Sequence, residues 1–264
     1  MSSFTAKDVQ TLRQATGAGM MDAKKALTEN DGDFDAAAKW LREQGLSKAA
    51  KRSDRENTDG AVALATTDGA VAMVQLKSET DFSAKAEDFV KVAEAVAEAV
   101  AARSEGAVDE LAEEVDQLKI TKKENIEVGK VVRWERSDSG VVDSYLHLQD
   151  GRGVNGVLVE LKGGSAELAH DIAVHIAFSK PEYLSRDDVP AEQVAAERAA
   201  LTDITKAEGK PEAALDKIVE GRLTGWFKER VLLEQNFVRD EKQTIAKLLG
   251  DAELVRFDQI VIGG

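Results

Sequence analysis

Residues that could do covalent or metal chemistry are sparse in this sequence, and none shows a catalytic spacing. His170 and His175 are five residues apart, whereas two histidines that bind a metal from one helix are four apart. There is no cysteine, which excludes thiolate ligands, disulfides and a cysteine nucleophile. Neither a glycine-rich phosphate loop nor a Gly-x-Ser-x-Gly nucleophile elbow occurs. Pairs of acids carry no information among 49 acidic residues, so the sequence predicts no metal site, no cofactor and no enzyme.

A different chemistry, contact with another protein, is suggested by Ser78–Ser83, whose sequence is SETDFS. This segment lies between a predicted strand and a predicted long helix. Phe82 precedes the apolar stripe of that helix, so its ring can fall outside the core. An aromatic ring beside an acid on a loop suits a wedge that inserts into a partner. The more ordinary interpretation is a staple, in which the ring packs on the following helix.

The run Gly17-Ala18-Gly19-Met20-Met21 is a second candidate for protein contact. Side chains of consecutive helical residues point about 100° apart, so Met20 and Met21 cannot both face a small core. An exposed methionine beside a loop suits an adaptable protein contact. The alternative is that both methionines tuck against Phe34 and Leu12.

Composition predicts a folded chain without affinity for nucleic acid or membrane. The 264 residues are 43% hydrophobic and 32% charged, typical of a globular protein with one to three domains. A net charge of −14 opposes binding to phosphate backbones. The opening MSSFTAKDVQ does not resemble a signal peptide, and no apolar run approaches the roughly 18 residues of a membrane span. We therefore expect a cytoplasmic protein.

Charge is distributed unevenly, since the residues up to Arg55 include ten basic and eight acidic side chains. The excess of acids lies in the rest of the chain. This asymmetry indicates that the first domain meets a different surface from the remainder. The alternative is an ordinary solvated surface.

Residues 1–46 are predicted to form a domain of three helices. Thr5 with Asp8 resembles a capping box at the first helix, and Gly17–Gly19 ends it. The second helix spans about 21–29. Asp33 can cap the third helix, and Gly45 is predicted as its C-terminal cap. Residues 47–59, rich in charge and poor in large apolar groups, are predicted as a linker.

Residues 60–125 are predicted as a first core subdomain. Apolar segments 61–66 and 70–77 flank Thr67-Asp68-Gly69, which is typical of a hairpin. A long helix follows, with an apolar stripe at Phe89, Val92, Val96 and Val100. A weaker helix is expected over 108–118.

A second core subdomain is predicted from 126–180 together with 231–264. It is expected to contain a three-stranded antiparallel meander, a helix over 166–178, a short helix over 244–249 and a last strand that joins the meander. The predicted strands are 126–135, 141–148 and 154–161, with turns at Ser137–Gly140 and Gln149–Gly151. Residues 181–230 are charged and helical, with a joint at Gly209–Pro211, and are predicted as an inserted helical hairpin. The fold class is therefore α+β.

Four blocks of this sequence, in order, resemble the elongation factor Ts family and together extend over most of the chain. They are TLRQATGAGMMDAKKALTENDGDFDAAAKWLREQG, SETDFSAKAEDF, HDIAVHIAFSKPEYLSRDDVP and KIVEGRLTGWFKERVLLEQNFVRDEKQTI. The resemblance implies an N-terminal three-helix domain of the ubiquitin-associated (UBA) type and a core of two β-containing subdomains. A helical hairpin is inserted in the second subdomain.

The resemblance also implies a function. Members of the family bind elongation factor Tu, in its GDP-bound and nucleotide-free forms, and speed the exchange of GDP for GTP. Asp81 and Phe82 are implied to enter the nucleotide domain of Tu near its magnesium site, with Thr80 and Ser83 completing the loop. The N-terminal domain is implied to hold the same domain of Tu, and the second core subdomain to grip the C-terminal region of Tu. The implied N-terminal contacts are Arg13, Met20, Met21 and Lys24.

This sequence departs from the family at two places. Ser83 stands where the family usually has Val, and this residue is expected either to loosen the loop or to cap the following helix. Some relatives carry a further C-terminal helical module that touches Tu, whereas this sequence ends at Gly264. The resemblance therefore does not imply that particular contact for this sequence. The hairpin mediates self-association in some relatives, so a homodimer through it stays open.

Two other classes of function compete with an exchange factor. A UBA-type adaptor would bind a protein through the first domain without exchange activity, and the ordered Thr-Asp-Phe and hairpin blocks argue against it. An enzyme with an unrecognised acid pair is opposed by the lack of any nucleophile, metal or phosphate motif.

Overall fold

The computed structural model describes residues 4–136 and 140–263. It combines helices with antiparallel strands, so the α+β prediction is confirmed. The chain forms two compact units. The first comprises Met1–Glu135, Leu148–Asn155 and Ile260–Gly264, and the second Arg136–His147 and Gly156–Gln259. The predicted turn at Ser137–Gly140 falls largely outside the described residues.

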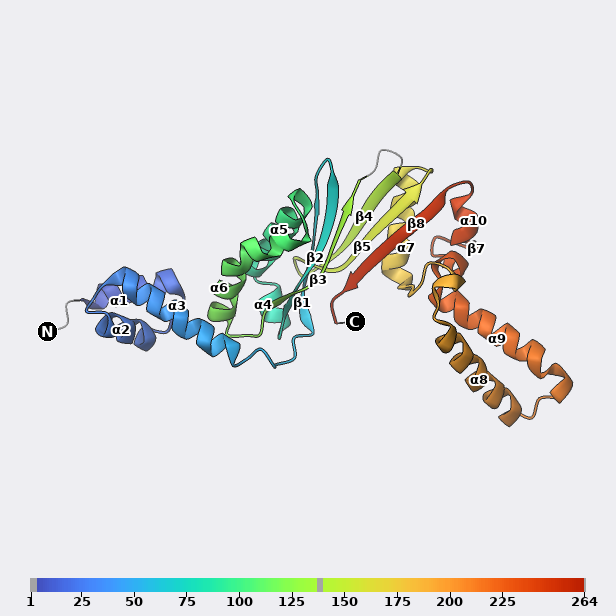
Figure 1. Ribbon diagram of the computed structural model, residues 1–264, viewed down its shortest axis with the longest axis horizontal. Helices are drawn as coiled ribbons and strands as arrows, with labels where there is room; N and C mark the ends of the chain where they lie inside the picture. The colour runs from blue at the N-terminus through green and yellow to red at the C-terminus, as the bar shows by residue number, and fades with distance from the viewer. Residues whose placement is uncertain (1–3, 137–139, 264) are drawn as a thin grey trace. The chain divides into compact units, whose positions relative to one another are not determined.

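The first unit opens with three helices, α1 (Ala6–Thr16), α2 (Met20–Glu29) and α3 (Phe34–Ala50) (Figure 1). The predicted capping box is confirmed, because Thr5 Oγ1 accepts from Asp8 N and the Asp8 carboxylate accepts from Thr5 N. Asp33 caps α3 through a bond from Ala36 N at 2.9 Å. The three helices bury a small common core: Val9, Leu12, Ala23, Ala26, Leu27, Ala37 and Leu41. The likeness of this bundle to the UBA fold stays a prediction.

The predicted helix end at Gly45 is wrong, because α3 continues through Gly45 to Ala50. It thereby takes up the first residues of the stretch predicted as a linker. A Cβ atom at Gly45 would lie 2.8 Å from Cγ1 of Ile120. Gly45 is therefore a point of close approach between helices, a role that a single sequence does not distinguish from a cap.

The sheet of the first unit contains a hairpin and a third strand. β1 (Asp59–Thr66) and β2 (Ala70–Ser78) pair antiparallel as predicted, and β3 (Glu127–Glu135) pairs with the other edge of β2. The helix α5 (Glu87–Ala102) packs on β1 and β2 with Phe89, Val96 and Val100 buried. A 3₁₀ turn, η1 (Glu105–Leu111), leads into α6 (Ala112–Lys122), which contacts α3.

The predicted three-stranded meander is wrong. β3 pairs with β2 through registers such as Val71↔Trp134 and Met73↔Val132. The next strands, β4 (Gly140–Gln149) and β5 (Arg152–Lys162), are neighbours of each other. Alternating hydrophobicity shows which face of a strand is buried but does not show which edge its neighbour occupies. The last strand, β8 (Glu253–Val261), pairs with β5.

In the second unit, α7 (Ala166–Ser179) packs its apolar face with buried residues of β5 and β8. A two-stranded hairpin of β6 (Asn236–Phe237) and β7 (Asp240–Thr244), which the sequence analysis missed, precedes α10 (Ile245–Leu249).

Two longer helices of the second unit, α8 (Ala191–Ala207) and α9 (Leu215–Arg230), pack on each other. The chain around them makes three short 3₁₀ turns: η2 (Arg186–Asp188), η3 (Glu212–Ala214) and η4 (Leu232–Glu234). That these helices form a dimerising insertion stays a prediction, as do the domain boundaries. Within residues 4–136 and 140–263, no helix has the length and apolar character to cross a membrane.

Candidate functional site

The Thr80–Ser83 loop enters a single helical turn, α4 (Asp81–Ala84), between β2 and α5. Thr80 begins this turn in extended conformation, and its Oγ1 accepts a hydrogen bond from Ser83 N at 3.3 Å. Ser78 Oγ donates to the carbonyl of Thr80 at 3.0 Å. The loop therefore has a defined, capped conformation at the end of a buried strand.

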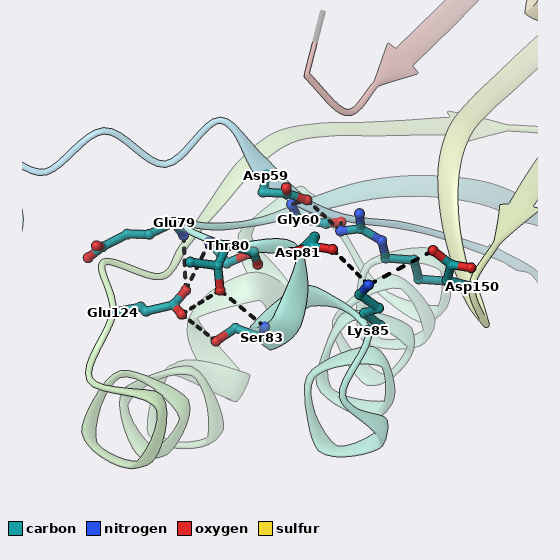
Figure 2. A network of polar contacts seen from close by, with 11 residues as sticks. Asp59, Gly60, Glu79, Thr80, Asp81, Ser83, Lys85, Glu124 and Asp150 are labelled. Carbon is teal, nitrogen blue, oxygen red and sulfur yellow. Dashed lines mark hydrogen bonds and ion pairs between the residues drawn. The ribbon is translucent and has the colours of Figure 1, made fainter.

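Glu124, which is distant from this loop in sequence, holds the loop through both of its carboxylate oxygens (Figure 2). Oε2 accepts from the backbone nitrogens of Glu79 and Thr80, at 3.1 and 3.2 Å. Oε1 accepts from Thr80 Oγ1 at 2.7 Å and from Ser83 Oγ at 2.6 Å. The sequence alone does not indicate Glu124, because one acid among 49 gives no signal of its own.

Phe82 is 81% exposed, so the interpretation of this ring as a staple on α5 is wrong. The Nζ atom of Lys85 lies 5.4 Å from the centre of the ring, in a cation–π arrangement. A cation–π contact at an exposed site contributes only about 0.5–1 kcal/mol. The ring is thus an apolar surface presented to solvent at the tip of a short, capped turn.

Asp81 faces Lys85 one turn later, with a separation of 2.7 Å between carboxylate and ammonium (Figure 2). The hydrogen bond from Lys85 lowers the pKa of Asp81, with a smaller contribution from the charge of Arg152. The same bond raises the pKa of Lys85. Asp150 lies 4.0 Å from the Lys85 ammonium. Asp81 is therefore a carboxylate at neutral pH, next to the exposed ring.

Ser83 neither loosens the loop nor caps a helix. Its side chain is buried and donates to Glu124, while Thr80 supplies the cap of α4 and Ala86 stands at the start of α5 without a side-chain bond. The hydroxyl that replaces the family's usual Val therefore gives the loop an additional polar anchor.

The predicted N-terminal contact residues lie on two adjoining helices, α1 and α2. Met20 and Met21 are 47% and 74% exposed, so the alternative that both tuck against Phe34 and Leu12 is wrong. Lys24 is exposed one turn further along α2. Arg13, in the last turn of α1, lines a shallow hollow together with Met20. These side chains are available for contact, and their binding role stays a prediction.

The histidines have structural partners. Nε2 of the buried His175 lies 3.0 Å from Gln235 Oε1, and its Nδ1 accepts from Val238 N at 3.3 Å. Burial lowers the pKa of His175, which keeps the ring neutral. His170 Nδ1 lies 2.9 Å from the Asp143 carboxylate. Among the residues that the structure describes, no group of three His, Cys, Asp or Glu side chains could hold a metal ion.

Comparison with known proteins places the chain in one family. The family model described as "Elongation factor TS" matches residues 79–263. Proteins named Elongation factor Ts from Clavibacter michiganensis subsp. michiganensis and Micrococcus luteus are 46% and 44% identical to the chain over 96% of its length, covering 96% and 95% of their own. The protein of the same name from Acidothermus cellulolyticus is 44% identical over 100% of the chain and 99% of its own. The resemblance carried by the four sequence blocks is confirmed, and the chain belongs to the elongation factor Ts family of translation elongation factors.

Proposed function

We propose that the protein is a guanine nucleotide exchange factor for elongation factor Tu. It binds the GDP-bound form of Tu and promotes GDP release by disturbing the Mg²⁺ and phosphate site, without covalent chemistry. The observation that carries this proposal is Phe82, which is 81% exposed on an anchored loop that matches the family's Thr-Asp-Phe segment. A large ring held in water by a defined turn is suited to insertion into a partner.

The two side chains at the tip of the loop act differently on a magnesium–phosphate site. The Asp81 carboxylate attracts Mg²⁺, which prefers oxygen ligands, and repels a phosphate. The Phe82 ring gains free energy by leaving water, and it displaces whatever groups of Tu occupied its place. Both effects disfavour bound GDP and favour the nucleotide-free form of Tu.

Exchange follows from this preference by thermodynamic linkage. A factor that binds nucleotide-free Tu more tightly than Tu with GDP must weaken GDP binding by the same coupling free energy. An acceleration of about 10⁴-fold lowers the barrier by about 5.5 kcal/mol, whereas burying one Phe contributes only about 1.5–3 kcal/mol. Contacts elsewhere, including Arg13, Met20, Met21 and Lys24, must therefore hold the factor on Tu while the loop acts.

Release of a fluorescent GDP analogue from the cognate Tu, followed by stopped flow, tests the proposal. We expect Phe82→Ala to lower the limiting release rate by about 10–150-fold, the equivalent of the burial energy of one ring. The affinity for Tu should change far less. The matched control is Ile204→Ala on α8, which truncates a half-exposed apolar side chain and should leave release unchanged.

Two results would contradict the proposal. An equal loss of rate and affinity in Phe82→Ala would show that the ring serves only as a binding contact. Failure of the intact protein to accelerate release, with Tu shown to be active, would favour the UBA-type adaptor that binds without exchange.

A further inference from the structure

Glu124 reaches the Thr80–Ser83 loop, named the exchange loop from here on, because the chain reverses directly after α6. Lys123 adopts a left-handed conformation with φ of 60°, which is uncommon for a residue with a Cβ atom. The reversal brings Glu124 and Asn125 alongside Glu79 and Thr80. Asn125 N donates to Glu79 Oε1 at 2.6 Å, while Glu79 N donates to Glu124 Oε2 at 3.1 Å. Each segment thus accepts a backbone hydrogen bond from the other, and the two segments form a reciprocal clamp.

The hydrogen bonds of Glu124 fill its accepting capacity. An ionised carboxylate has about four lone-pair sites, and Glu124 receives four donors from Glu79, Thr80 and Ser83. Bonds to a charged acceptor are roughly twice as strong as bonds between neutral groups. One side chain therefore anchors the loop both before and after the Asp81–Phe82 tip.

The exposed tip needs support from the residues on either side of it, although Ala84 at the end of the same turn is buried in the core. α4 has four residues, and forming an isolated helical turn is unfavourable because it fixes several torsions for one hydrogen bond. Phe82 is largely in solvent, so packing does not orient it. Its direction depends on the backbone of α4, and that backbone is tied to Glu124 through Thr80 and Ser83 (Figure 2).

We propose that Glu124 is the positioning residue of the exchange loop, which it holds in the single helical turn that points Phe82 toward the partner. This inference rests on the proposed exchange function. Glu124 touches neither the nucleotide nor the metal, and it acts through the ring that it positions. The nearer carboxylate, Asp81, pairs with Lys85 and belongs to the tip itself.

A double-mutant cycle in the stopped-flow assay distinguishes positioning from a general structural role. Glu124→Ala should lower the limiting rate of GDP release by at least about tenfold, the scale expected for lost hydrogen bonds to a charged group. In the Phe82→Ala background the same change should lower the rate by no more than about threefold, since the group that it positions is absent. Glu114→Ala, which removes an exposed glutamate of α6, is the matched control and should be silent in both backgrounds. Equal effects of Glu124→Ala in the two backgrounds would overturn the inference.

Hydrogen exchange of the free protein supplies a readout that does not depend on Tu. The amides of Glu79 and Thr80, which donate to Glu124, should exchange at least about tenfold faster in Glu124→Ala and unchanged in Glu114→Ala. If the hydrogen-exchange rates of these two amides are unchanged in Glu124→Ala, the positioning role is overturned, even if the unmutated protein accelerates GDP release from Tu. A different outcome would refute the proposed function and leave the positioning role standing. In that outcome these amides exchange faster in Glu124→Ala, but the unmutated protein does not accelerate GDP release from Tu. If Glu124→Ala does not fold, Glu124→Gln keeps the shape without the charge and should show both effects at smaller size.

Discussion

Gly60 permits a close backbone approach in the sheet of the first unit, and replacing it by alanine should destabilise that unit strongly. Gly60 has a φ of 147°, and a Cβ atom there would lie 2.2 Å from the carbonyl oxygen of Leu76 and 3.0 Å from Cα of Lys77. Both are backbone atoms of β2, the strand paired with Gly60 in register, so no side-chain rotation relieves the clash. Backbone strain costs about 1–3 kcal/mol and overpacking a further 1–3 kcal/mol. We therefore expect Gly60→Ala to lower the free energy of unfolding by about 2–6 kcal/mol.

Urea unfolding followed by tryptophan fluorescence measures this loss. Trp134 lies buried on β3 and pairs with Val71 of β2, so it reports on the same sheet. Trp40 and Trp226 are replaced by Phe to isolate its signal. The matched control is Gly69→Ala in the β1–β2 turn, where a Cβ atom would meet open space and the change should stay within about 0.5 kcal/mol. A Gly60→Ala protein as stable as the control would refute the steric argument.

The remaining predictions concern a buried histidine and the methionines of the bundle. Burial lowers the pKa of His175 below its ordinary 6.5, so protonation favours the unfolded chain, and the second unit should lose stability as pH falls below about 6.5. The urea midpoint, read from Trp226 fluorescence, should therefore drop less between pH 7.5 and pH 5.0 in His175→Gln than in the natural protein. An equal drop in the two proteins would show that protonation of His175 does not cause the loss. Met20→Ala and Met21→Ala remove exposed side chains and should change unfolding by less than about 0.5 kcal/mol while weakening Tu binding at least about threefold, as titration calorimetry would show. Unchanged affinity in both would remove them from the contact surface.

Elements whose signals are local could be predicted from the sequence. The Thr5–Asp8 capping box, the Asp33 cap and the β1–β2 hairpin each depend on residues a few positions apart. The placement of β3 could not be predicted in this way. Its partner residues on β2 lie 50 to 65 positions earlier, and either edge of β2 would satisfy the same alternation of buried and exposed residues. The role of Gly45 escapes prediction for a similar reason, since the side chain that it admits, Ile120, is distant in sequence.

In the candidate site, too, features set by neighbouring residues can be recognised from the sequence, and features set by residues far apart cannot. The exposure of Phe82 was only one of two interpretations that the sequence left open, since an aromatic residue at this position more often packs on the following helix. The four-residue spacing of Asp81 and Lys85 could have indicated their ion pair. The anchor could not be predicted. Glu124 lies 44 residues from Thr80, and it reaches the loop only because Lys123 adopts a left-handed conformation that lysine does not favour.

The anchored state of the loop decides whether Phe82 can be an effective wedge. Ordering a flexible residue costs about 1–2 kcal/mol, so the four residues Thr80–Ser83 would cost about 4–8 kcal/mol if they became ordered only on binding. Burying the ring returns about 1.5–3 kcal/mol, which is less than that cost. A loop already folded on Glu124 avoids most of the ordering cost before the partner arrives. It follows that losing the clamp should slow exchange by no more than losing Phe82, because Glu124 acts through the ring that it positions.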